Sequence, residues 1–230
     1  MNYIYGTPAK RGPEADLVLD FINSSLPPQS GDLWQSIFIE LDLGNSIPDI
    51  VIVYWDPDIA SKWPTKRRLL KKVDFKLIQY LYKNGPETEN NLLHIFPRGL
   101  SSILDRLTLT AIISRSDCEW ELRPIEEIFA VKKIFSFEAK ISASMRVFEQ
   151  ALLNSTFSSE SYIVTKSETP RNQALDFAQK LGIGIWCQKK VGYNPLIKAK
   201  ELPLPQSYLS WLFNNLVWEY SLGGKNEYKC

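Results

Sequence analysis

Two acidic residues and one lysine in this chain have the types and positions that phosphodiester chemistry requires. Asp49 directly precedes a run of apolar residues, and Glu138 and Lys140 lie two positions apart in a second apolar stretch. Residues two apart in a strand share one face, so an acid that begins one strand and this pair in another strand can converge at one edge of a sheet. Magnesium usually takes one or two carboxylates from a protein, with water and substrate phosphate completing its shell.

This combination predicts metal-assisted hydrolysis. A bound Mg²⁺ or Mn²⁺ acidifies a water ligand and neutralises charge on a phosphodiester, and a lysine beside it can orient or deprotonate the attacking water. The only histidine, His94, lies between Leu93 and Ile95 in a short helical segment, so we expect a structural role for it. The chain has no phosphate-binding P-loop and no G-x-S-x-G elbow, so nucleotide hydrolysis and acyl transfer lack their usual residues.

The composition is that of an ordinary globular protein, with 44% hydrophobic and 23% charged residues in 230. Three scattered cysteines without a C-x-x-C pair argue against a disulfide framework and a zinc site. No signal sequence or membrane-length apolar run is present, so we expect a cytoplasmic protein without a membrane partner.

The net charge is only +1, but residues 62–76 hold seven Lys or Arg against one acid, Asp74. This run is either a solvated linker or a phosphate-contacting patch.

Apolar periodicity outside the middle of the chain predicts an α/β core. The expected elements are a helix at 12–26, strands at 35–44 and 47–55, then a strand at 132–142, a helix at 144–157, a strand at 161–166, a helix at 169–182 and a strand at 183–188. A last helix at 206–220 is apolar on all sides. It therefore either completes the core or forms a dimer interface.

The middle segment has a different pattern: helices are expected at 74–85, 88–96 and 98–109, followed by two short strands within 111–124. This order resembles a winged helix-turn-helix, so we expect an insert at 66–124 within a core made of 1–62 and 126–230. In DNA-binding members the third helix enters the major groove and the wing approaches the backbone. A protein-interaction role is the alternative. The candidate DNA contacts are Arg98, Ser101, Ser102, Arg106 and Arg115, together with Lys66, Arg67 and Arg68 from the basic run.

The residues Pro48-Asp49 and Glu138-Ala139-Lys140 resemble the PD-(D/E)xK signature of the restriction-endonuclease-like nuclease superfamily. The predicted order helix–strand–strand–strand–helix–strand is similar to the core of that family. The resemblance implies a mixed sheet flanked by helices, with Mg²⁺ bound by Asp49 and Glu138 and the attacking water assisted by Lys140. The two halves of the motif are farther apart here than is usual in the family, and the insert accounts for the excess.

The same resemblance implies further site residues. The leading helix often supplies another acid, here Glu14, and the helix after E-x-K often supplies a polar residue that touches metal-bound water or phosphate. Gln150 or Arg146 would fill that second role. Each has a plain structural alternative, since Glu14 also suits a first helical turn and Arg146 and Gln150 also suit a solvated face. Similarly, Asp49 fits a turn before a strand, and the Glu138–Lys140 pair fits the exposed side of an edge strand.

The sequence therefore predicts an Mg²⁺- or Mn²⁺-dependent endonuclease acting on double-stranded DNA, in restriction or another defence system, in a mobile element or in repair. Double-strand cleavage would favour a homodimer or a partner subunit. A DNA-binding or scaffold protein whose nuclease-like core no longer cleaves is the main alternative. An RNA nuclease is a third, because the metal chemistry does not discriminate the sugar.

Overall fold

The computed structural model describes the chain except residues 1, 9–10, 29–30, 45, 143–144 and 223–230. It is an α/β protein with a seven-stranded mixed sheet flanked by helices and a separate three-stranded antiparallel sheet. The described residues form two compact units. Unit 1 comprises residues up to 54 together with 132–206, and unit 2 comprises 55–131 together with 207–222.

The larger sheet has the strand order β1-β2-β3-β7-β8-β9-β10. β1 runs parallel to β2. The three strands β7, β8 and β9 are also parallel to one another, and β10 is antiparallel to β9. The strand bounds are β1 (Asn2–Tyr5), β2 (Trp34–Ile39), β3 (Ile50–Trp55), β7 (Val131–Lys140), β8 (Glu160–Thr165), β9 (Gly184–Gln188) and β10 (Tyr193–Ile197). Every residue of β3 and β8 is buried, as expected for strands covered on both faces.

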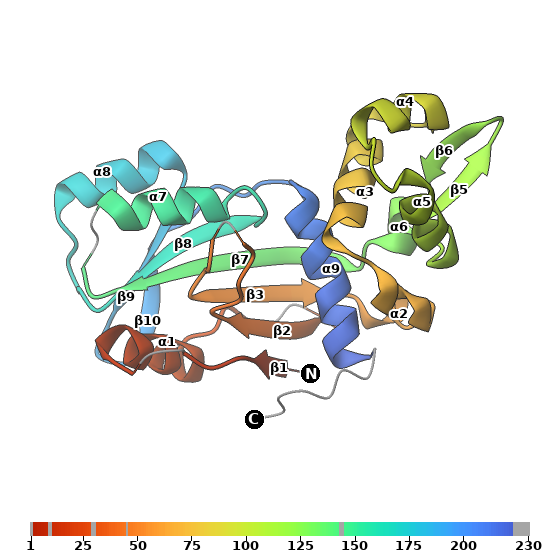
Figure 1. The fold of residues 1–230 in the computed structure, drawn as a ribbon. Helices are drawn as coiled ribbons and strands as arrows, with labels where there is room; N and C mark the ends of the chain where they lie inside the picture. The colour runs from red at the N-terminus through yellow and green to blue at the C-terminus, as the bar shows by residue number, and fades with distance from the viewer. Residues whose placement is uncertain (1, 9–10, 29–30, 45, 143–144, 223–230) are drawn as a thin grey trace. The chain divides into compact units, whose positions relative to one another are not determined.

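Helices cover both faces of this sheet (Figure 1). α1 (Pro13–Ser24) lies on one face, and α7 (Met145–Asn154) and α8 (Asn172–Leu181) lie on the other. α1 begins at Pro13, whose fixed φ suits a first helical position, and it buries an apolar stripe. That stripe is Leu17, Val18, Phe21 and Ile22. α8 begins at Asn172, three residues later than predicted, with Arg171 as its N-cap.

Unit 2 contains the helices and strands predicted for the middle of the chain, with additional short elements. Its sheet has the order β4-β6-β5. Thr88 caps α4, since its side chain accepts a hydrogen bond from the Asn91 backbone N–H at 3.3 Å. The bounds are α2 (Pro57–Ala60), η1 (Thr65–Leu69), α3 (Lys72–Asn84), β4 (Glu87–Thr88), α4 (Glu89–Ile95), α5 (Leu100–Leu109), β5 (Ile113–Ser116), β6 (Glu119–Leu122) and α6 (Ile125–Ile128).

The terminal helix α9 (Tyr208–Ser221) groups with unit 2, whereas the sequence analysis assigned it to the core of 126–230. The Trp211 ring packs edge-on against Phe129, with the ring centroids 4.9 Å apart, and its indole N–H donates to the Gln79 side chain at 2.8 Å. Asn214 accepts from the Ala130 backbone N–H at 2.7 Å and donates to the Ile128 carbonyl at 2.9 Å. The helix therefore contributes to the core of unit 2, and its predicted role as a dimer interface stays a prediction. No helix in the described part of the chain is long and apolar enough to cross a membrane.

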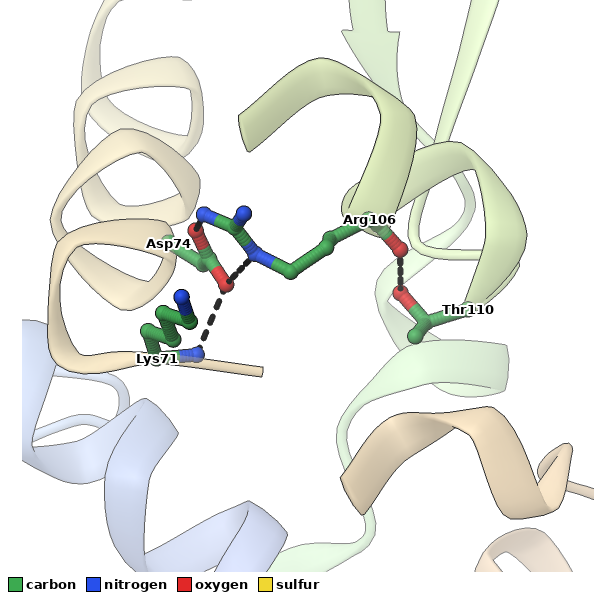
Figure 2. A network of polar contacts seen from close by, with 4 residues as sticks. All are labelled: Lys71, Asp74, Arg106 and Thr110. Atoms are coloured by element: carbon green, nitrogen blue, oxygen red, sulfur yellow. Dashed lines mark hydrogen bonds and ion pairs between the residues drawn. The ribbon is translucent and has the colours of Figure 1, made fainter. Parts of the chain in front are cut away.

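A buried ion pair joins α3 to α5 (Figure 2). Asp74, the third residue of α3, accepts from the Lys71 backbone N–H at 2.7 Å and from the Arg106 guanidinium at 2.6 and 2.8 Å. Its side chain has no exposed surface, and that of Arg106 is 16% exposed. The hydrogen bonds to Asp74 raise the pKa of Arg106 above its ordinary value. Asp74 therefore serves both as a helix-start acceptor and as the counter-ion of Arg106.

Candidate active site

The first predicted acid, Asp49, lies immediately before β3 and reaches across to β7, its neighbour in the sheet. Its Oδ2 atom accepts a hydrogen bond from the Ala139 backbone N–H at 2.7 Å. Its carbonyl accepts from the Glu40 N–H at 3.1 Å, which closes the turn between β2 and β3. Asp49 is therefore a positioned side chain, and its carboxylate lies beside the Glu138–Lys140 segment as the sequence predicted.

Glu138 carries a buried carboxylate that is only half satisfied. The residue is 2% exposed, and its Oε1 atom accepts from Asn154 Nδ2 at 2.7 Å. Its Oε2 atom is buried without a hydrogen-bond partner among the described residues. Burial, followed by the nearby charge of Asp49, raises the pKa of Glu138 to about 8. Burial also raises the pKa of Asp49, although the Ala139 hydrogen bond and the charge of Lys140 act against it.

Lys140 ends β7 and connects these acids to α1. Its Nζ atom lies 2.9 Å from Glu14 Oε2 and 3.8 Å from Asp49 Oδ2. Burial lowers the pKa of Lys140, but the hydrogen bond to Glu14 and the charges of the surrounding carboxylates outweigh it, so that the pKa is raised. At neutral pH the side chain is therefore an ammonium group that donates hydrogen bonds.

The structure thus brings together four of the five residues that the sequence analysis assigned to catalysis: Asp49, Glu138, Lys140 and Glu14. The fifth, Gln150, is half-buried on α7 and makes no side-chain hydrogen bond within the described residues.

One turn beyond Gln150, Asn154 contacts Glu138 instead. Asn154 follows Arg146 and Gln150 at four-residue spacing, and this spacing is the signal that the sequence contains. Arg146 itself is exposed on the first turn of α7.

The donor set fits a hard cation. No group of three or more His, Cys, Asp or Glu side chains among the described residues is arranged as a metal site. However, magnesium commonly takes only one or two carboxylates and keeps several waters. Glu138 Oε2 is an orphaned, buried carboxylate oxygen near a second carboxylate, and the charge of Asp49 raises the pKa of Glu138. A cation between Asp49 and Glu138 would remove the cost of this arrangement.

Six of the candidate DNA contacts in unit 2 lie at its surface. Arg98, Ser101 and Ser102 are exposed at the start of α5. Arg115 is exposed on β5, with its guanidinium 5.3 Å from the centre of the Trp120 ring. Lys66 and Arg68 are exposed on η1.

Two further candidates are engaged within unit 2: Arg67 is buried, and Arg106 is half-buried in its ion pair with Asp74. Arg67 is 1% exposed, and its guanidinium lies 3.5 Å from the centre of the Trp63 ring and donates to the Ile128 carbonyl at 3.3 Å. Burial lowers its pKa to about 9. Because Arg106 is held by Asp74, neither guanidinium is available to a partner. Their assignment as DNA contacts is therefore replaced by structural roles.

No family model, no curated protein and no solved structure matches the chain.

Proposed function

We propose that this protein is a metal-dependent DNA endonuclease of the PD-(D/E)xK type. The observation that carries the proposal is the buried, unpartnered Glu138 Oε2 next to Asp49, with the Lys140 ammonium at the same edge. A buried carboxylate whose pKa is raised by burial and by a second carboxylate is costly to ionise unless a cation neutralises the charge. A cation held by these carboxylates, with the Lys140 ammonium beside it, would suit a phosphodiester, whose reaction places extra negative charge on phosphate oxygens.

Each residue of the site then has a distinct task. Asp49 and Glu138 would hold the Mg²⁺ or Mn²⁺, which when bound acidifies water and neutralises phosphate charge. Asn154 orients Glu138 by binding Oε1, which leaves Oε2 for the cation. Glu14 fixes the Lys140 ammonium, which would orient the attacking water or stabilise the phosphate oxygens as a hydrogen-bond donor. The raised pKa of Lys140 favours this donor role over proton abstraction.

The fold supports the same assignment. The order α1, β2, β3, β7, α7, β8 agrees with the helix–strand–strand–strand–helix–strand core expected for restriction-endonuclease-like enzymes. In unit 2, α3, α4 and α5 followed by the β5–β6 hairpin agree with a winged helix. We propose that this unit holds the duplex, which makes double-stranded DNA the substrate.

Cleavage of supercoiled plasmid tests the nuclease. We expect nicking or linearisation with Mg²⁺ or Mn²⁺ and none in EDTA. Lys140→Ala should lower the rate about 10²- to 10³-fold, because it removes a positioned donor at the reacting phosphate. Asp49→Asn should lower it at least as far, since it keeps an acceptor for the Ala139 N–H but removes a ligand charge.

A matched control is Lys132→Ala, which removes an exposed lysine from the same strand and should leave the rate unchanged. Activity that survives both Lys140→Ala and Asp49→Asn would refute the proposed site. A wild-type protein that binds DNA and cleaves none with either metal would instead support the non-catalytic DNA-binding or scaffold alternative.

A further inference from the structure

The basic run of residues 62–76 belongs to unit 2 and is mostly exposed. Of its seven Lys and Arg residues, Arg67 is buried and the other six are exposed. The single acid of the run, Asp74, is buried against Arg106 and so does not neutralise its neighbours. We call the six exposed residues the basic face: Lys62, Lys66, Arg68, Lys71, Lys72 and Lys76.

Most of the charges of the basic face are uncompensated. Lys66, Arg68, Lys71 and Lys76 make no salt bridge within the described residues. Lys72 and Lys76 are one helical turn apart on α3, and their Nζ atoms lie 5.6 and 5.7 Å from the centre of the same Tyr208 ring. This ring keeps the two ammonium groups on one side of the helix. Along the axis of α3, the backbone positions of Lys72 and Lys76 are about 6 Å apart. Two phosphate steps along one DNA strand cover a similar distance, roughly 7 Å along the axis of the duplex.

The α5 surface, where a winged helix usually reads bases, is poorer in positive charge. Its central arginine, Arg106, is held by Asp74, and the outward residues of α5 include Ser101, Ser102 and the acid Asp105. Base recognition needs side chains that form paired hydrogen bonds in the major groove, most often arginine, asparagine or glutamine. Lysines, by contrast, act as point charges toward phosphates.

We infer that unit 2 holds duplex DNA by its phosphate backbone on the basic face, without reading base sequence. The inference rests on the proposed function for its choice of partner, since the site of unit 1 suits a phosphodiester. A lipid surface fits less well, because Leu69 is the one large apolar side chain exposed within residues 62–76 and membrane-surface segments need a broad apolar face.

Binding measured in EDTA tests the inference separately from cleavage. Fluorescence anisotropy would follow the full chain on two labelled duplexes of unrelated sequence, over a range of salt concentrations. We expect equal affinity for both duplexes. The triple variant Lys66→Gln, Arg68→Gln, Lys76→Gln should bind roughly tenfold or more weakly, and its slope of log affinity against log salt should be shallower by about 0.9 for each lost phosphate contact.

Two further variants serve as controls for the basic-face variant. Lys180→Gln, Lys190→Gln, Lys198→Gln removes the same charge from exposed lysines of unit 1 and should bind like the wild type. Ser101→Glu, Ser102→Glu adds charge to α5 and should weaken binding less than the basic-face variant does. Circular dichroism and thermal unfolding would confirm that all variants fold.

The inference is overturned if the basic-face variant keeps the wild-type affinity and salt slope, if the two duplexes bind with different affinities, or if the α5 variant has the larger effect. It is also overturned if anionic lipid vesicles or single-stranded RNA bind more tightly than the duplex. The two proposals fail separately. If the basic-face variant loses binding but no protein cleaves DNA, the inference stands and the proposed nuclease is refuted. If cleavage is metal-dependent but the basic-face variant binds like the wild type, the nuclease stands and the inference is refuted.

Discussion

Replacing Arg106 with methionine is expected to destabilise unit 2 by about 3–5 kcal/mol. The substitution leaves Asp74 as a fully buried carboxylate without its counter-ion (Figure 2). Only the Lys71 backbone N–H would still bind it. Urea unfolding followed by tryptophan fluorescence measures this loss, because five of the seven tryptophans lie in unit 2.

The matched control is Arg98→Met, which removes an exposed arginine from the residues just before α5 and should change the stability little. Asp74→Asn added to Arg106→Met should recover part of the stability, since the remaining buried group is then uncharged. A loss of less than about 1 kcal/mol for Arg106→Met, the value typical of exposed pairs, would contradict the account of this ion pair. Such a result would also make Arg106 available again as a DNA contact.

Burial of these charged residues could not be predicted from the sequence. Asp74 and Arg106 are partners on different helices. The sequence around Asp74 indicates only its local partner, the Lys71 backbone N–H at the start of the helix. A run of Lys and Arg in sequence has the same appearance whether its members are solvated or, as Arg67 is, buried over a tryptophan. The arrangement of helices decides which charge is buried, and that arrangement depends on contacts distant in the chain.

The central strands were predictable because they are long and apolar, whereas the edge strands were not. β1 is four residues long and β10 contains Pro195, which is tolerated only at a sheet edge and weakens any strand prediction. In the site, the spacing of Glu138 and Lys140 predicted their shared strand. The direction in which α7 crosses the sheet decides which of its turns lies over Glu138. For this reason Asn154, and not Gln150, donates a hydrogen bond to Glu138.

Replacing Glu138 with glutamine is expected to stabilise the metal-free protein at alkaline pH. The pKa of Glu138 is about 8 in the folded chain, against an ordinary value of 4.5. Between these two pH values the folded state keeps a proton that the unfolded state has lost, so the wild-type protein loses stability as the pH rises through this window. Glutamine does not titrate, and its oxygen still accepts from Asn154. By pH 9 the variant should therefore be more stable than the wild type by roughly 3–5 kcal/mol.

Thermal unfolding in EDTA from pH 5 to pH 9 measures this difference, and Glu149→Gln, at an exposed position of α7, is the matched control. The same experiment reports on the cation. At pH 8, adding Mg²⁺ should raise the unfolding temperature of the wild type, because the cation binds the folded carboxylates and replaces the proton of Glu138. It should have little effect on Glu138→Gln. Parallel pH profiles for the two proteins would refute the buried, protonated Glu138. A flatter variant profile with no Mg²⁺ effect on the wild type would keep the buried acid and remove the metal from the proposed mechanism.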